Sequence, residues 1–301
     1  MAISEQWAEL LEPGLRAIFV EQQTALAAES KIPALFNVIG SGKAAEHFLG
    51  AGGLSDWNEY EGGIEYDDFD QLYKTTLTHK EYVKGFKVER KLVDDDQYGL
   101  INPRPRQLAI SAMRTREKHA ASIFNNAFSA SYTGGDSIRL CNASHPLAPT
   151  HSADVQSNAG TTALSYTSLN ATRELMRAYT DDRGELTPVM PDTLLIPAEL
   201  EEAANAIAKT VNKPDTGDYH ANFAGNWLKA IVVWDYLTDA NNWFLIDSRL
   251  SKIHLLWIDR MPLEFAMDPT SDFSLEARYR GYMRYSYGWS DYRWLYGHNV
   301  T

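Results

Sequence analysis

The chain has 301 residues with 28 Lys or Arg and 40 Asp or Glu, so its formal net charge is −12. This acidic balance argues against a protein whose main task is to grip nucleic-acid backbone. Hydrophobic residues make up 44% of the chain, which excludes a disordered protein. Cys141 is the single cysteine, so no intrachain disulfide can form and a reducing compartment is favoured. Because no apolar run approaches the roughly 20 residues of a membrane helix and no signal peptide is present, we expect a soluble intracellular protein without a membrane partner.

Residues 1–55 predict a loose N-terminal arm rather than a packed unit. Pro13 and Gly14 interrupt one helical pattern, and Pro33 breaks the next one. Segment 40–53 then holds five glycines, which is too many for a packed element. We therefore expect this arm to lie on some other surface.

Residues 56–96 predict an extended β-ribbon. Segments 72–78 and 82–93 favour strands, and in the second strand Phe86 and Val88 alternate with charged residues. A two-stranded ribbon with one modest apolar face is barely stable alone. We therefore expect the ribbon to need a neighbour as well.

The strongest helix of the sequence is predicted over about 105–132. Pro103 and Pro105 suit its first turn, and the glycine pair at 134–135 suits its end. An apolar stripe covers only one side of this helix. Most of the remaining surface is basic, with a single acid, Glu117, among Arg104, Arg106, Arg114, Arg116 and Lys118. Two interpretations stay open: a solvated helix face, or a face turned to a polyanion or to an acidic neighbouring subunit.

The C-terminal half predicts an α/β core. A turn-rich excursion over 134–167 precedes a short helix over 168–179, and a buried strand over 193–196 runs into Pro197 and a further helix. Three apolar runs are typical of central strands in one sheet: 230–237, 243–246 and 253–258. The last stretch, 273–296, alternates like a long strand and is rich in Tyr and Trp.

No group of residues predicts an active site. Segment 40–43 resembles a phosphate-binding loop but lacks its first glycine and its Ser or Thr. Cys141, His145 and His151 are spaced like metal ligands, yet no fourth ligand is near, so a loop with a buried thiol is favoured. Acidic runs at 67–70 and 94–96 suit turns better than opposed catalytic carboxylates. We expect no catalytic residue, no metal and no cofactor.

The C-terminal aromatic residues allow a second interpretation. Exposed Trp289 and Trp294 could stack on sugars, which would make the chain a carbohydrate-binding or carbohydrate-active protein. Aromatic cross-strand pairs inside a sheet explain the same pattern more simply.

Several fragments follow one another along the chain: YKTTL at 73–77, VERKLVDDD at 88–96, the helix over 107–128, SHP at 144–146, Asn158, LS at 164–165, LNA at 169–171, DTLLIPAELEEAA at 192–204, DYLTD at 235–239, NWFL at 242–245 and YGW at 287–289. In this order they resemble the tailed-phage major capsid proteins with the Hong Kong 97-type fold, and most of all the Mu-like major head subunit family. Each fragment alone is weakly specific, and their shared order carries the resemblance.

The resemblance implies an α+β chain with the Hong Kong 97-type capsid fold. It divides the chain into an N-terminal arm, an extended loop (the β-ribbon), a peripheral domain that contains the long spine helix, an axial α/β domain, and C-terminal strands that return to the sheets. The expected bounds are 1–55, 56–96, 97–190, 191–264 and 265–301.

The resemblance also implies a function, namely a major capsid protein that self-assembles into pentamers and hexamers of an icosahedral shell around double-stranded DNA. Expected partners are other copies of the chain, a portal protein, a separate scaffolding protein, decoration proteins, and packaged DNA contacted without sequence specificity. The expected location is the virion, with the host cytoplasm during assembly, and no enzymatic activity is expected. The alternative within the same fold is an encapsulin-like shell of a cellular nanocompartment.

We expect the outer half of the ribbon to make the main inter-subunit contact, because its hydrophobic face is thin and one-sided. The candidate contact residues are Tyr66, Phe69, Leu72, Tyr73, Arg114 and Arg116. Some relatives crosslink a ribbon lysine to a neighbouring asparagine. Nothing in this sequence marks the partner of such a bond, so no crosslink is predicted.

Overall fold

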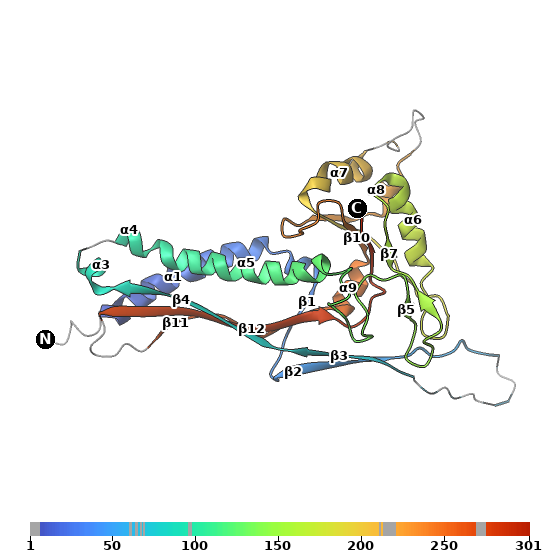
Figure 1. Ribbon diagram of the computed structural model, residues 1–301, viewed down its shortest axis with the longest axis horizontal. Helices are drawn as coiled ribbons and strands as arrows, with labels where there is room; N and C mark the ends of the chain where they lie inside the picture. The colour runs from blue at the N-terminus through green and yellow to red at the C-terminus, as the bar shows by residue number, and fades with distance from the viewer. Residues whose placement is uncertain are drawn as a thin grey trace.

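The computed structural model describes residues 7–59, 62, 63, 66, 68, 70–95, 98–210, 212, 221–268 and 275–301. These residues form a four-stranded sheet, a five-stranded sheet and two two-stranded pairs. Figure 1 shows an elongated part, made of the long sheet and two helices, beside an upright lobe that holds the C-terminus. None of the described helices combines the length and apolar character needed to cross a membrane.

The long sheet has the strand order β1-β11-β12-β4. Its strands are β1 (Asn37–Gly40), β11 (Leu255–Asp268), β12 (Glu276–Trp289) and β4 (Lys80–Glu89). Helices α1 (Trp7–Glu29) and α5 (Pro103–Asn125) pack on each other and cover one face of this sheet (Figure 1). Phe19 and Phe265 lie in the buried layer between the helices and the strands. The short helices α3 (Arg90–Asp94) and α4 (Tyr98–Ile101) connect β4 to α5.

The upright lobe is built on the second sheet, with the order β7-β13-β10-β8-β9. Its strands are β7 (Ala159–Gly160), β13 (Leu295–His298), β10 (Trp243–Ile246), β8 (Thr193–Ile196) and β9 (Ala230–Val233). Every residue of β8 and β10 is buried, because both faces of this sheet carry a hydrophobic cluster. The remaining helices are α2 (Ile32–Leu35), α6 (Tyr166–Arg177), α7 (Glu201–Lys209), α8 (Ala224–Trp227) and α9 (Ser248–His254), with a 3₁₀ turn over Ala198–Leu200.

The strands predicted over 193–196 and 243–246 match β8 and β10, and the helix predicted over 168–179 corresponds to α6. The prediction that 230–237, 243–246 and 253–258 share one sheet is wrong for the last run, because residues 255–258 begin β11 of the long sheet, and the strand in the first run ends at Val233. The long terminal strand over 273–296 is wrong in one respect. Residues 290–294 form a turn, so the stretch is divided into β12 and β13, which belong to different sheets.

The predicted spine helix corresponds to α5, but it ends at Asn125 rather than near residue 132. The backbone leaves the helix because the N–H of Ala127 bonds back to Phe124 at 3.1 Å, while the carbonyl of Ala127 accepts from Cys141 at 2.8 Å. A tertiary hydrogen bond therefore takes the carbonyl that another helical turn would have used.

The predicted ribbon is wrong in its strand pairing. Strand β3 (Gln71–Thr78) pairs with β2 (Ala45–Ala51), whereas β4 pairs with β12 of the long sheet. The glycine-rich segment before β3 thus contains a strand that composition argued against. The apolar face of β4 is responsible, because Phe86 and Val88 are packed into the cluster beneath α1 and α5 and hold β4 in the long sheet.

The prediction of a loose N-terminal arm is also wrong, because residues of this segment form α1, β1 and β2. Leu15 and Phe19 of α1 are 2% and 1% exposed, because they pack into the chain's own long sheet. Helix α1 continues through Pro13. Burial of large apolar side chains outweighs the cost of one proline in the helix.

Candidate functional site

The antiparallel β2–β3 hairpin lies along the lower edge of the molecule in the view of Figure 1. Residues 52–70, here called the distal loop, connect the two strands; they carry seven acidic residues, four aromatic residues and no Lys or Arg. Within the part of this loop that the structure describes, Trp57 is 97% exposed and Tyr66 is 87% exposed. These two exposed aromatic side chains make the distal loop a candidate contact surface.

The base of the distal loop is held by the turn that follows α6. The N–H of Gly53 donates to Oδ1 of Asp182 at 2.9 Å, and Nη2 of Arg183 donates to the carbonyl of Asp68 at 3.0 Å. A Cβ at Gly52 would overlap the Asp182 carboxylate, so glycine is required for this close approach. The loop direction is therefore set by a specific contact with the lobe.

A cavity of about 510 Å³ lies between the base of the hairpin and the body. Leu72 and Tyr73 line it from β3, and His254 and Asp291 line it from the body. Burial lowers the pKa of His254, whose Nδ1 lies 3.0 Å from Oγ of Ser290. Oδ2 of Asp291 lies 2.9 Å from Nη1 of Arg293, so this carboxylate forms an ion pair with Arg293 and not with the imidazole of His254. These polar groups make a structural joint, not a nucleophile with its base.

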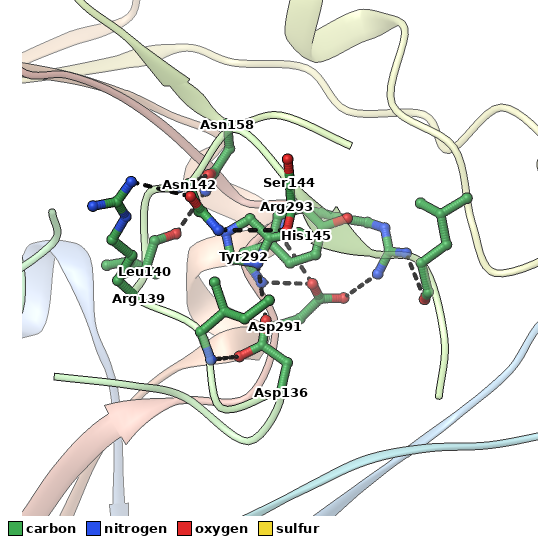
Figure 2. Close-up of polar contacts among 12 residues, drawn as sticks. Asp136, Arg139, Leu140, Asn142, Ser144, His145, Asn158, Asp291, Tyr292 and Arg293 are labelled. Carbon is green, nitrogen blue, oxygen red and sulfur yellow. Dashed lines mark hydrogen bonds and ion pairs between the residues drawn. The ribbon is translucent and has the colours of Figure 1, made fainter. Parts of the chain in front are cut away.

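A buried polar cluster supports this joint (Figure 2). Nδ1 of His145 lies 2.9 Å from Oδ2 of Asp136, and its ring stacks on Tyr292 with a centroid distance of 3.9 Å. The guanidinium of Arg293 also donates to the carbonyl of Leu147 at 3.3 Å. These contacts tie the excursion after α5 to the turn between β12 and β13.

The structure shows the surroundings of two of the three residues, Cys141, His145 and His151, that are spaced like metal ligands in the sequence. His145 is engaged with Asp136, Cys141 is fully buried, and burial raises the pKa of its thiol. Across the described part of the chain no three potential ligands lie close enough to hold a metal ion. Burial, rather than coordination, accounts for the cysteine.

The basic residues of α5 do not all have the same environment: Arg116 is paired within the chain, whereas others are exposed to solvent. Arg116 forms a two-pronged ion pair with Asp259, each N–O distance being 2.9 Å, and lies over the ring of Trp257. Glu117 is buried and accepts hydrogen bonds from Nε1 of Trp234 at 2.9 Å and from a serine hydroxyl. The exposed basic residues of the helix face are Arg106, Arg114 and Lys118.

The predicted contact residues thus lie in different parts of the structure. Tyr66 is exposed in the distal loop, Leu72 and Tyr73 lie half-buried at the hairpin base, and Arg114 is exposed on α5. Arg116 finds its partner within its own chain, and Phe69 lies outside the described residues. A role of these residues between subunits stays a prediction. Sequence reasoning missed Trp57, although it lies in the same outer half of the predicted ribbon as Tyr66.

The sugar-stacking interpretation of the C-terminal aromatic residues is wrong. Trp289 and Trp294 are 6% and 0% exposed. Trp294 meets Phe124 edge to face with a centroid distance of 6.1 Å, and Tyr132 packs on Trp289 at 5.6 Å. These rings are core residues and offer no face to a sugar.

Comparison with protein families decides the identity. Residues 73–297, about three quarters of the chain, match the model of a family described as phage capsid protein. The chain belongs to the phage capsid protein family. A search of the curated proteins finds no match to this capsid chain.

Solved structures show the same fold for this capsid protein. The bacteriophage JBD30 capsid is 13% identical, with a TM-score of 0.56 over 69% of this chain and 91% of that one. The Microbacterium phage Oxtober96 structure is 10% identical, with a TM-score of 0.54 over 90% and 91%. The JBD30 procapsid is 16% identical, with a TM-score of 0.51 over 96% and 75%. The expected capsid fold and the expected function of a phage capsid protein are confirmed.

Proposed function

We propose that this capsid protein assembles into the pentamers and hexamers of an icosahedral shell through its distal loop, which reaches a neighbouring copy. The observation that carries the proposal is Trp57, a large aromatic side chain that is 97% exposed at the end of a hairpin. Because the loop and the surface it would meet belong to different patches of the subunit, the contact is head-to-tail, and such contacts form rings when the rotation between copies closes.

The energy available at this contact is substantial. Aromatic side chains bury roughly 150–250 Å² each, which at about 25 cal/mol per Å² corresponds to about 4–6 kcal/mol for one fully covered ring. Ordering the loop and bringing two copies together offset part of that gain. Many identical contacts within one shell then make assembly favourable although each single contact is modest.

The direct test replaces residues 54–69 with a short Gly-Ser linker and leaves β2 and β3 in place. We expect a folded subunit with an unchanged circular dichroism spectrum that stays monomeric in light scattering. The unmodified chain should give rings, tubes or shells in negative-stain electron microscopy. Shells formed by the shortened chain would show that the distal loop is not the assembly contact.

We further propose a Mu-like branch, packaged double-stranded DNA as the contents, and a separate scaffolding protein and a portal protein as partners. One solved JBD30 capsid is described as decorated with minor capsid protein trimers, which supports decoration proteins as a further class of partner. The location that fits is the virion, after assembly in the host cytoplasm. Because the polar clusters described above are occupied by structural contacts, a non-enzymatic role is the one proposed.

The contents of purified particles distinguish this proposal from the nanocompartment alternative. Particles from infected or induced cells should contain nuclease-protected double-stranded DNA. A folded enzyme in place of DNA would identify an encapsulin-like shell instead.

A further inference from the structure

Helix α6 carries two arginines that have no acidic partner. Arg173 and Arg177 are four residues apart, so they project from the same side of the helix. Arg173 is half-buried and Arg177 is exposed. Among the described residues, none accepts a hydrogen bond from either guanidinium or forms an ion pair with it. Two cationic groups thus lie together without a bound counter-charge.

The side chain of Arg173 is held in place by aromatic residues at α8. Helices α6 and α8 lie next to each other on the upright lobe (Figure 1). Cζ of Arg173 lies 5.2 Å from the ring centroid of Phe223 and 5.0 Å from that of Trp227. A guanidinium that stacks on aromatic rings uses its flat faces, and its N–H groups stay available at the edge. The edge of Arg173 is therefore a set of oriented donors.

The two rings are fixed in turn by α6. Nε1 of Trp227 donates to Oδ1 of Asn170 at 3.2 Å, and the backbone N–H of Phe223 donates to Oη of Tyr166 at 3.3 Å. Nδ2 of Asn170 donates to the carbonyl of Tyr166 at 2.9 Å. Tyr166, Asn170 and Arg173 follow one another at helical spacing. One stripe of α6 therefore positions the rings and also carries the arginine that stacks on them.

Other half-buried or buried arginines of this chain have a carboxylate beside them. Arg116 and Arg293 each lie 2.9 Å from an aspartate oxygen. The charge of Glu174 reaches Arg173 from the next position in the sequence, but the two form no ion pair. Burial and the charge of Arg177 lower the pKa of Arg173, as expected for a cation that lacks a counter-charge. An anion bound between the two arginines would supply that charge.

We propose that Arg173 and Arg177 bind a phosphate group on the side of the lobe. The fork of N–H donors on Arg173 matches two phosphate oxygens, and Arg177 can donate to a third. A phosphate dianion balances both cations, whereas one carboxylate balances only one of them. Free phosphate, a phosphate monoester and the phosphodiester of a nucleic acid all present these oxygens. The inference does not rest on the proposed function, because no residue of the distal loop takes part.

The first experiment measures binding of inorganic phosphate to the full chain by isothermal titration calorimetry. The pH is slightly alkaline, and sodium chloride keeps the ionic strength constant. We expect saturable binding of one phosphate per chain, weakened at least tenfold by Arg173→Gln and several-fold by Arg177→Gln. The matched control, Arg114→Gln, removes the same charge from an exposed arginine of α5 and should bind normally. Absence of binding, or equal weakening by the control, would overturn the proposal.

A second measurement separates phosphate binding from a purely structural role of Arg173. Arg173→Lys keeps the charge and the aliphatic stem but lacks the planar fork, so it should fold normally and bind phosphate more weakly. Added phosphate should raise the melting temperature of the unmodified chain and leave that of Arg173→Gln unchanged. If Arg173→Gln does not fold, Arg177→Gln takes its place, because that residue is exposed. An equal rise in the unmodified chain and the variant would show that phosphate acts elsewhere.

Competition experiments identify the source of the phosphate group. A double-stranded oligonucleotide that displaces inorganic phosphate would extend the site to phosphodiesters, and one that does not would restrict it to free phosphate and monoesters. Both results keep the assignment of a phosphate site. Acetate that binds as tightly as phosphate would show that the arginines take a carboxylate, and the proposal would then be wrong.

Discussion

The environment of His298 leads to a quantitative pH prediction. Its imidazole stacks on Trp243 with a centroid distance of 4.0 Å, Nε2 lies 2.8 Å from Oγ1 of Thr172, and Nδ1 lies 3.0 Å from Oγ1 of Thr162. A Cβ at Gly160 would overlap the ring, so the site is closely packed on that side as well. Burial lowers the pKa of His298 to about 4, from an ordinary value near 6.5.

The sign and size of the effect follow from proton linkage. Because the unfolded chain binds the proton at a higher pH than the folded chain does, stability is complete above about pH 6.5 and falls as the pH drops toward about 4. At pH 5 this single group costs about 2 kcal/mol of unfolding free energy, and the full loss is about 3 kcal/mol.

The assay compares unfolding of the subunit in urea at pH 7.5 and pH 5, followed by tryptophan fluorescence. Burial also lowers the pKa values of His79, His119 and His254, so the unmodified chain should lose stability from several groups. His298→Gln removes one of them and should lose about 2 kcal/mol less than the unmodified chain over this pH interval. An identical pH dependence in both proteins would refute the reasoning.

Three further predictions concern other parts of the fold. Phe124 packs edge to face on four aromatic neighbours in the core, so Phe124→Ala should cost about 3–5 kcal/mol in urea unfolding. Arg116→Met leaves the half-buried Asp259 carboxylate without its cation and should lower the unfolding free energy by about 2–3 kcal/mol. Adding Asp259→Leu to the same chain should recover this stability, and a failure to do so would show that the ion pair is not the cause. Gly52→Ala should displace the Asp182 carboxylate, leave the melting temperature within a few degrees, and increase protease cleavage in the distal loop; unchanged cleavage would contradict the proposed fastening.

The buried polar groups of this protein have a common purpose. The Arg116–Asp259 pair joins α5 to β11. Arg293, which is paired with Asp291 in its own turn, donates to the carbonyls of Thr180 and Leu147 far along the chain. Removing one member of such a pair is costly, so these pairs help to specify one arrangement of the hairpin, the excursion and the sheets.

Local sequence patterns were sufficient to predict the elements whose burial does not depend on which other element they pack against. The strands β8 and β10 and the helices α5 and α6 were predictable because continuous apolar runs, prolines at a helix start and helical periodicity act over a few residues.

Only the tertiary structure decided which strands pair and which charges face inward. The sequence places 72–78 and 82–93 side by side, but β3 joins β2 while Phe86 and Val88 hold β4 in the long sheet. Arg116 and Arg114 look alike in the sequence, yet one is paired with Asp259 and the other is exposed. Strand pairing and charge burial depend on partners far along the chain, and no local pattern specifies which distant segment will be the partner.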